Sequence, residues 1–272
     1  MNNKNYISSL YLWEERTLYL GPLFEPVRMK NGAGSIAFAL TGTMKVKCSG
    51  SRKLTTCKSF LVPPGTSFTV FTGDSIIANH MLDVMGHDYA VLVQQMRLKG
   101  NDPKKHISFE IQDEQAYISK LQELYQNQYP WKVAEDEIDQ LFTPPKYLST
   151  TKRKIDPRVE KVVSYIKENI TENVSIDLLA KEVNISTPHL VKIFKAQIGV
   201  PIRRYRLWHR LFVASIILAR TGNLTTAALS AGFSDASHFL HTFQDVLGMR
   251  ASLLLNQPNK ISILTEPEAE HY

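Results

Sequence analysis

Basic side chains gather in the last third of this 272-residue sequence, and their spacing suggests a chemical task. Lys192 and Lys195 stand three residues apart, which places them at neighbouring positions on one face of a helix. Four arginines follow closely: Arg203, Arg204, Arg206 and Arg210. Clustered ammonium and guanidinium groups neutralise phosphates. The cluster therefore predicts a surface that binds a polyanion.

The net charge is concentrated in the same region. Residues 151–255 hold 15 Lys+Arg against 8 Asp+Glu, a net +7, whereas residues 1–150 hold 16 against 15, a net +1. The whole chain carries +6. A basic excess confined to one segment is typical of a nucleic-acid-binding domain.

Groups that could support catalysis are sparse. A catalytic metal needs two or three histidines with a carboxylate at suitable spacing, but His80 and His87 stand isolated in the sequence. Cys48 and Cys57 flank a turn at residues 49–53 and could face each other across a hairpin. A redox switch is thus one alternative. Two reduced thiols are the other, and we prefer them for a cytosolic chain. We expect no catalytic residue, no metal ligand and no cofactor.

Two segments share a pattern of turn residue, phenylalanine and glycine. The first contains Asn184-Ile185-Ser186, His189-Leu190, Phe194 and Gly199, and the second contains Gly232-Phe233-Ser234, His238-Phe239, Phe243 and Gly248. Asparagine and glycine tolerate the left-handed backbone of a sharp helix–helix turn. A serine follows two residues later in each copy, where the next helix needs an N-cap. The pattern predicts two helix-turn-helix units, over residues 176–197 and 225–247.

These segments resemble the paired helix-turn-helix units of AraC/XylS-type regulators. The resemblance also includes Leu179-Ala180, Tyr205, Arg210-Leu211, Ala214 and Leu218 between and within the two copies. It covers about 100 residues. It implies two DNA-reading helices, joined by one long helix, that enter successive major-groove segments on one face of the duplex.

The resemblance places the first recognition helix at about Ser186–Gln197 and the second at about Asp235–Leu247. The residues expected at the DNA are Ser186, Thr187, Pro188, His189, Val191, Lys192, Lys195, Arg203, Arg204, Arg210, Ala236, Ser237, Leu240, His241 and Gln244. The second unit departs from the first in charge, because His241 and Gln244 stand where Lys192 and Lys195 stand in the first.

The difference in charge extends to the whole of the second unit and its surroundings. Residues 221–255 carry a net −1, with one Lys+Arg against two Asp+Glu, whereas residues 151–220 carry +8, with 14 against 6. Because phosphate neutralisation supplies much of DNA affinity, the first unit and the joining helix should bind most strongly. The second unit should read DNA mainly by fit, with Leu240 against a thymine methyl group.

The predicted fold class is α+β with two domains, an N-terminal antiparallel β-barrel with helices and a C-terminal all-α domain. Residues 1–100 contain short apolar segments between turn residues, at Ser35–Leu40, Thr43–Lys47, Ser59–Val62, Ser67–Phe71, Ser75–Asn79 and Tyr89–Gln95. Residues 101–151 should contain a helix at Gln112–Tyr129, which could pack internally or pair two subunits, and then a connector over Trp131–Thr151.

The C-terminal domain should occupy residues 152–255, followed by a tail over residues 256–272. Asp156-Pro157 is an N-cap followed by a proline in the first turn, and a long helix should follow Pro201. The N-terminal domain resembles a cupin-like effector module more weakly. That resemblance rests on Trp13-Glu14-Glu15-Arg16, Leu20-Gly21-Pro22, Leu40-Thr41-Gly42-Thr43 and Leu61-Val62-Pro63-Pro64-Gly65.

The resemblance implies a sequence-specific transcription regulator, more often an activator, whose partners are promoter DNA, RNA polymerase, a small-molecule effector and a second copy in a homodimer. No apolar run approaches the roughly 20 residues that span a bilayer, so we expect no membrane partner and a cytoplasmic location. Two alternatives stay open: a cupin-type metal enzyme or sensor fused to a DNA-binding module, and a weakly specific architectural DNA binder.

Overall fold

Two β-sheets form the N-terminal part of the protein. The computed structural model describes residues 7–23, 26–30, 32–98, 107–143, 155–247 and 261–266. One sheet has seven strands in the order β10-β7-β4-β9-β2-β1-β11, and the other has four in the order β3-β8-β5-β6. The strands are β1 (Ser9–Trp13), β2 (Arg16–Pro22), β3 (Val27–Lys30), β4 (Gly34–Ala39), β5 (Met44–Cys48), β6 (Leu54–Cys57), β7 (Ser59–Val62), β8 (Ser67–Phe71), β9 (Ile76–Leu82), β10 (Ser108–Phe109) and β11 (Ser262–Leu264).

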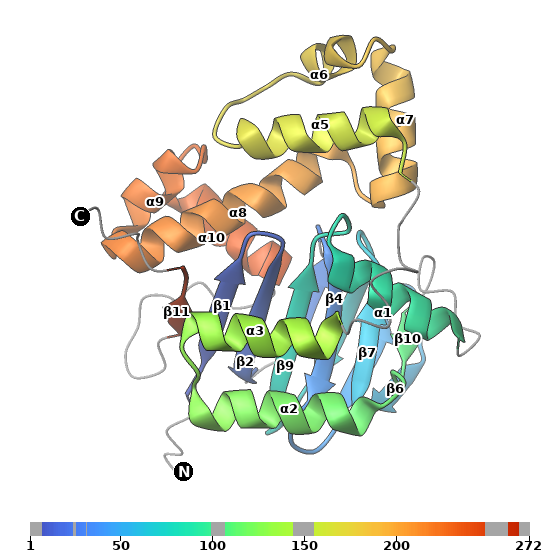
Figure 1. The fold of residues 1–272 in the computed structure, drawn as a ribbon, viewed down its shortest axis with the longest axis vertical. Coiled ribbons are helices and arrows are strands. Elements are labelled where there is room, and N and C mark those ends of the chain that lie inside the picture. Colours follow the sequence, from blue (N-terminus) through green and yellow to red (C-terminus); the bar gives the residue numbers. More distant parts are fainter. Residues whose placement is uncertain are drawn as a thin grey trace.

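The seven-stranded sheet is buried on both faces. One face packs on the four-stranded sheet, for instance through Phe60 against Phe68, whose ring centroids lie 5.7 Å apart. The other face is covered by α1 (His87–Leu98), α2 (Glu114–Asn127) and α3 (Trp131–Phe142), as Figure 1 shows. Burial on both faces explains why β1, β2, β4 and β7 have no exposed position.

The two sheets bear on the expected architecture, because the apolar segments of residues 1–95 suit either an antiparallel sandwich or a barrel. Among the described strands, no backbone pairing joins the two sheets, so a closed barrel is not confirmed; the arrangement is a sandwich with helices on its outer side. Residues Tyr89–Gln95, expected as a strand, lie in α1. A short apolar run buried on several sides has the same appearance in a strand and in a helix, which is why this prediction was wrong.

Two predictions concern the region after α1. The helix expected at Gln112–Tyr129 is confirmed as α2, and the connector expected over Trp131–Thr151 is wrong at its start. The apolar face of α2, formed by Ile118, Leu121 and Leu124, is buried against the sheet, so it is not available to a second subunit. The connector expected after Trp131 begins instead with α3. Its buried residues Ala134, Ile138 and Phe142 are four apart, which is a helical spacing.

The two cysteines do not face each other. Cys57 pairs with Met44 across the β5–β6 hairpin, so Cys48 lies four residues further along β5, about 13 Å away. Both are free thiols, and burial raises the pKa of Cys57 to about 12. The redox-switch alternative is therefore not supported.

The C-terminal part is helical, as expected. Its elements are α5 (Pro157–Glu168), α6 (Ile176–Glu182), α7 (Thr187–Ile198), α8 (Ile202–Thr221), α9 (Leu224–Ser230) and α10 (Ala236–Leu247). Asp156 caps α5 by accepting a hydrogen bond from the backbone N–H of Arg158 at 2.9 Å, as the Asp-Pro pair predicted. After α10 the chain returns to the first domain, where β11 pairs in parallel with β1.

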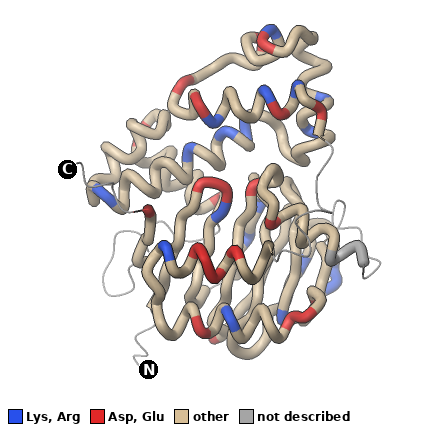
Figure 2. The backbone as a smooth tube through the Cα atoms, in the orientation of Figure 1, with Lys and Arg blue, Asp and Glu red and all other residues tan. Residues whose placement is uncertain are grey.

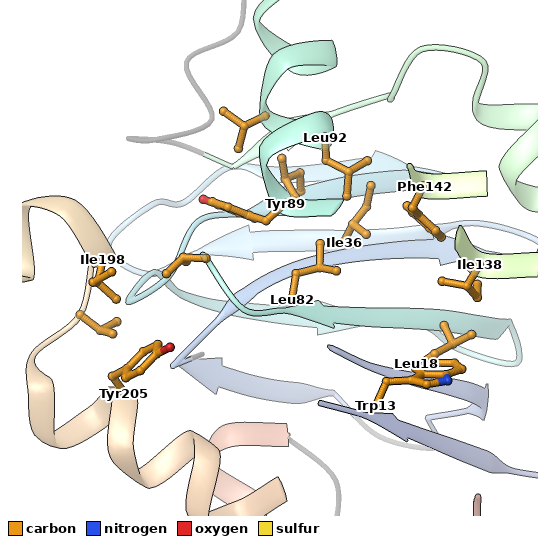
Figure 3. Close-up of a cluster of buried hydrophobic side chains, with 14 of the residues drawn as sticks. Trp13, Leu18, Ile36, Leu82, Tyr89, Leu92, Ile138, Phe142, Ile198 and Tyr205 are labelled. Carbon is orange, nitrogen blue, oxygen red and sulfur yellow. The ribbon is translucent and has the colours of Figure 1, made fainter. Parts of the chain in front are cut away.

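The hydrophobic core continues across the boundary between the two parts. Tyr205 and Ile198 belong to the same buried cluster as Leu82 and Ile36 of the seven-stranded sheet. Figure 3 shows Ile198 and Tyr205 on the helical part, beside the ends of the strands, and Leu82 and Ile36 over the sheet. The loop after β7 also approaches the C-terminal end of α7, because a Cβ on Gly65 would lie 3.0 Å from the carbonyl oxygen of Gly199. The helical C-terminal part is thus packed on the N-terminal part, which we term the sheet domain.

Candidate DNA-binding site

The first helix-turn-helix unit is formed by α6 and α7. Ser175 caps α6 by accepting a hydrogen bond from the backbone N–H of Leu178 at 3.1 Å. Asn184 makes the turn with a φ of 54°, the left-handed conformation that its residue type predicted. Ser186 is the N-cap residue of α7 and is exposed, but its side chain makes no capping hydrogen bond. Its hydroxyl is therefore free for another partner.

Helix α7 divides into a buried and an exposed face. Its buried side chains are Leu190, Phe194 and Ile198. Five of the residues expected at the DNA are exposed on it: Pro188, His189, Val191, Lys192 and Lys195. Thr187 is half-buried, and its hydroxyl donates to Asp177 of α6 at 2.6 Å. The exposed valine is 40% accessible, so this face carries apolar as well as cationic groups.

The second unit repeats this geometry with α9 and α10. Gly232 makes the turn with a φ of 80°, and a Cβ there would lie 2.6 Å from the carbonyl oxygen of Thr171. Only glycine fits this close approach. Asp235, rather than the expected Ser234, caps α10 by accepting a hydrogen bond from the backbone N–H of His238 at 2.8 Å. That bond is the largest of the effects that lower the pKa of Asp235.

Helix α10 presents a mostly uncharged surface. Its buried side chains are Phe239, Thr242, Phe243, Val246 and Leu247. Of the residues expected at the DNA, Ser237, His241 and Gln244 are exposed, and Ala236 and Leu240 are half-buried. The two helices therefore expose equivalent faces with different charge, as their sequences predicted.

Helix α8 connects the two units, and its arginines contact different parts of the protein. Arg210 donates to the carbonyl oxygens of Ile170 and Gly232 at 2.8 and 2.9 Å, and to two more in residues 171–172. It fastens the turn after α5 to the turn before α10. These carbonyl oxygens engage four of the five N–H donors of Arg210, which argues against its expected contact with DNA.

Arg204 also makes a contact within the protein. Its guanidinium donates to the carbonyl oxygen of Lys30 in the sheet domain, and burial lowers its pKa. This contact between domains argues against the expected DNA contact of Arg204. Arg203, by contrast, is exposed and lines a cavity of about 770 Å³ between the two units, together with Arg206 and Ser175.

A buried ionic cluster joins the two domains around Asp83, which follows β9. Its Oδ2 accepts a hydrogen bond from the Tyr205 hydroxyl at 2.9 Å and pairs with Lys167 Nζ of α5 at 3.1 Å. His209 Nε2 lies 3.4 Å away without a hydrogen bond. Burial acts to raise the pKa of Asp83, but His209, Lys167 and a backbone N–H together lower it to about 2. This cluster could not be predicted from the sequence, because the side chains that form it are distant along the chain.

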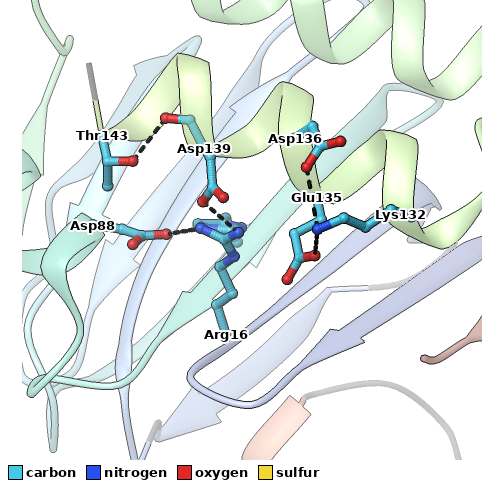
Figure 4. A network of polar contacts seen from close by, with 8 residues as sticks. Arg16, Asp88, Lys132, Glu135, Asp136, Asp139 and Thr143 are labelled. Atoms are coloured by element: carbon cyan, nitrogen blue, oxygen red, sulfur yellow. Dashed lines mark hydrogen bonds and ion pairs between the residues drawn. The ribbon is translucent and has the colours of Figure 1, made fainter. Parts of the chain in front are cut away.

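A second polar network lies within the sheet domain. Arg16 of β2 pairs with Asp88 of α1 at 2.9 Å and Asp139 of α3 at 2.6 Å, as Figure 4 shows. The buried His80 lies 3.4 Å from Asp88, and burial lowers the pKa of its imidazole. This network fastens the helices to the sheet. It borders a cavity of about 620 Å³ that Trp13 also lines.

Known proteins match the two halves of the chain differently. A family model described as a helix-turn-helix domain matches residues 179–257. The lactose operon transcription activator of Staphylococcus xylosus is 28% identical over 109 residues, which are 40% of this chain and 39% of that protein. Residues 179–257 therefore match a helix-turn-helix domain, and we refer to α5–α10 as the AraC-type domain because its sequence resembles that family.

Other relatives agree with this domain. The HTH-type transcriptional regulator GbdR of Pseudomonas aeruginosa is 27% identical over 115 residues, 42% of this chain and 30% of that protein. The chain therefore matches less than half the length of these curated relatives.

A likeness in fold extends over both domains. A crystal structure of an apo ToxT variant from Vibrio cholerae superposes with a TM-score of 0.57, at 19% identity, over 93% of this chain and 98% of ToxT. A ToxT structure bound to an unsaturated fatty acid superposes with a TM-score of 0.52 at 16% identity, over 94% of this chain and 96% of ToxT. The AraC-type domain and the sheet domain are thus arranged in a two-domain fold already known.

Two other kinds of site were sought in the part of the chain that the structure describes. There, no three His, Cys, Asp or Glu side chains lie close enough together to hold a metal ion. Among the same residues, no helix combines the length and apolar character that crossing a bilayer requires.

Proposed function

We propose that this protein is a transcription regulator that binds duplex DNA through α7 and α10. The observation that carries the proposal is the pair of matching turns, at Asn184 and Gly232, each followed by a helix with an exposed face. An α-helix fits the major groove of B-DNA, and the side chains on its exposed face can reach base edges there. The relatives of the AraC-type domain, named as transcriptional regulators, support the same function.

The two units contribute unequally in this proposal. Lys192 and Lys195 give α7 two exposed cations, and Arg203 adds a third near the start of α8. Helix α10 offers His241 and Gln244 at the corresponding places. Phosphate contacts and bidentate base contacts both favour cations, so α7 supplies most of the affinity and α10 reads mainly by shape.

The test compares Lys192→Ala with His241→Ala on a duplex that the full-length protein has selected from a random pool. Both residues are exposed, so neither change should unfold the protein. We expect Lys192→Ala to weaken binding about 10-fold in a gel-shift titration at fixed salt, and His241→Ala to weaken it less than about 3-fold. Equal losses would refute the inequality. Equal binding of the wild type to unrelated duplexes would instead favour an architectural binder.

We further propose that a small-molecule effector acts on the sheet domain and that the response is activation. The fold likeness to ToxT, solved with an unsaturated fatty acid, supports an effector. The relative named as an activator supports activation. A thermal-shift screen of the full-length protein, with unsaturated fatty acids among the compounds, should find ligands that also change DNA affinity. Stabilising ligands that leave DNA affinity unchanged would contradict an effector role.

The remaining assignments stay predictions from the sequence. They are the domain limits, the cupin-like relationship of the sheet domain, a homodimer, contact with RNA polymerase, a cytoplasmic location and the absence of enzyme activity. Chromatin immunoprecipitation with and without the sheet domain would name the regulated genes, and analytical ultracentrifugation would give the oligomeric state.

A further inference from the structure

The near-neutral charge of the sheet domain conceals two strongly charged sides. Residues 27–72 contain seven Lys+Arg and no Asp or Glu, a net +7, whereas residues 110–142 contain two against eight, a net −6. The first stretch includes all four strands of the smaller sheet, and the second includes α2 and α3. The two lie on opposite sides of the seven-stranded sheet. Figure 2 shows acidic residues along the helical side.

The basic side is produced by the pleat of β3 and β5. Along each strand, buried apolar residues alternate with exposed cations. The exposed cations form what we term the basic face, and they are Arg28, Lys30, Lys45 and Lys47. The strand register places Arg28 beside Thr69 of β8, and Thr69 beside Lys47, so that one row crosses three strands. Two interstrand spacings separate the cations of this row by about 10 Å.

The four cations of the basic face are not engaged in ion pairs in the part of the chain that the structure describes. Arg52 and Lys53 of the β5–β6 turn and Lys58 are also exposed and add to the same excess. Unpaired like charges on one surface repel each other, and this repulsion is relieved when a polyanion binds. The charge of the face therefore fits a phosphate backbone.

The basic face is continuous with the proposed DNA-binding site. Strand β3 is the edge strand of its sheet, and α10 packs against it. Arg204 of α8 donates to the carbonyl oxygen of Lys30, which fixes this edge to the AraC-type domain. The face thus begins beside the recognition helix that has the fewest cations of its own.

We propose that the basic face binds the phosphate backbone of the duplex beside the segment that α10 reads. This inference rests on the proposed function. It makes the sheet domain a part of the DNA-binding surface and supplies the charge that the second unit lacks. The two-unit site then has a cationic contact at each end, α7 at one and the basic face at the other.

The test measures how salt weakens DNA binding by the full-length protein. The duplex is the selected site, extended by one helical turn beyond the footprint on both sides. Lys45→Gln/Lys47→Gln removes two charges from the basic face, and Lys120→Gln/Lys132→Gln removes two from the acidic helical side as a matched control. Each phosphate contact contributes about 0.9 to the slope of log affinity against log salt, so the first variant should lower the slope by about 1.8. The control should leave it unchanged.

Each outcome decides the proposal. Identical slopes for the two variants and the wild type would overturn the inference. Lys192→Ala serves as a reference: if it weakens binding while the basic-face variant does not, only this inference fails, and if neither weakens binding, the proposed function fails as well. Binding to vesicles containing phosphatidylserine that the basic-face variant loses, with an unchanged DNA slope, would overturn the inference in favour of a membrane contact.

Discussion

Replacing Asp83 with asparagine tests whether a buried carboxylate holds the two domains together. Asparagine keeps the shape and can still accept a hydrogen bond from Tyr205, but it has no charge to pair with Lys167. The pKa of Asp83 lies at about 2, against an ordinary value of 3.8. This difference corresponds to about 2 kcal/mol of stability at neutral pH. We expect Asp83→Asn to lower the free energy of unfolding by about that amount.

The stabilisation by Asp83 should decrease as the pH is lowered. A carboxylate whose pKa is lower in the folded state stabilises the protein fully above its unfolded pKa, and this contribution is lost as pH falls toward the folded value. The difference between wild type and Asp83→Asn should therefore be constant from pH 7 to about 5 and fall to about half by pH 3. Urea unfolding at pH 7, 5, 4 and 3 would measure it.

Two controls make the result interpretable. Asp74→Asn alters an exposed carboxylate of the same domain and should cost less than about 0.5 kcal/mol. A double-mutant cycle with Tyr205→Phe should give a coupling energy of about 0.5 kcal/mol or more, because the two side chains are in contact. A wild-type advantage as large at pH 3 as at pH 7 would show that the charge of Asp83 contributes nothing, and the reasoning would be refuted.

Three further predictions concern single positions. Gly232→Ala should destabilise the protein by more than about 2 kcal/mol in urea unfolding, because a Cβ at this position would clash with a carbonyl oxygen. Gly222 has open space around it, so Gly222→Ala should show only the smaller cost of a positive φ. Equal losses would exclude the steric explanation. Arg210→Lys should lower the melting temperature while leaving the salt slope of DNA binding unchanged, because the guanidinium binds carbonyl oxygens and not phosphate; a reduced slope would contradict this. Oxidation should form no intramolecular disulfide between Cys48 and Cys57, as non-reducing mass spectrometry would reveal.

The helix-turn-helix units were predictable because their determinants are local. Each turn contains a residue in the left-handed conformation, Asn184 in the first unit and Gly232 in the second. The helix that follows each turn needs a polar N-cap residue and an apolar residue at every third or fourth position. The exposed positions of α7 and α10 then follow from the period of the helix. Even here, Asp235 replaced Ser234 as the cap, because two adjacent polar residues compete for the same backbone N–H.

The contacts between domains were not predictable from one sequence. Arg204 and Arg210 lie among other arginines at helical spacing, and nothing local distinguishes a side chain that meets phosphate from one that meets a carbonyl oxygen. Lys167 and Tyr205, the side-chain partners of Asp83, are more than 80 residues away. Strand β11 has three residues and pairs with the first strand of the chain, so its sequence alone carries little signal.

That pairing of β11 with β1 sets a mechanical limit on the protein. The chain leaves the sheet domain after α3 and rejoins it at β11, so the AraC-type domain is attached to the sheet domain at both of its ends. The shared core around Tyr205 and the contacts of Asp83 attach the two domains further. If the proposed effector shifts the AraC-type domain, α7 and α10 should therefore move together rather than separate from each other.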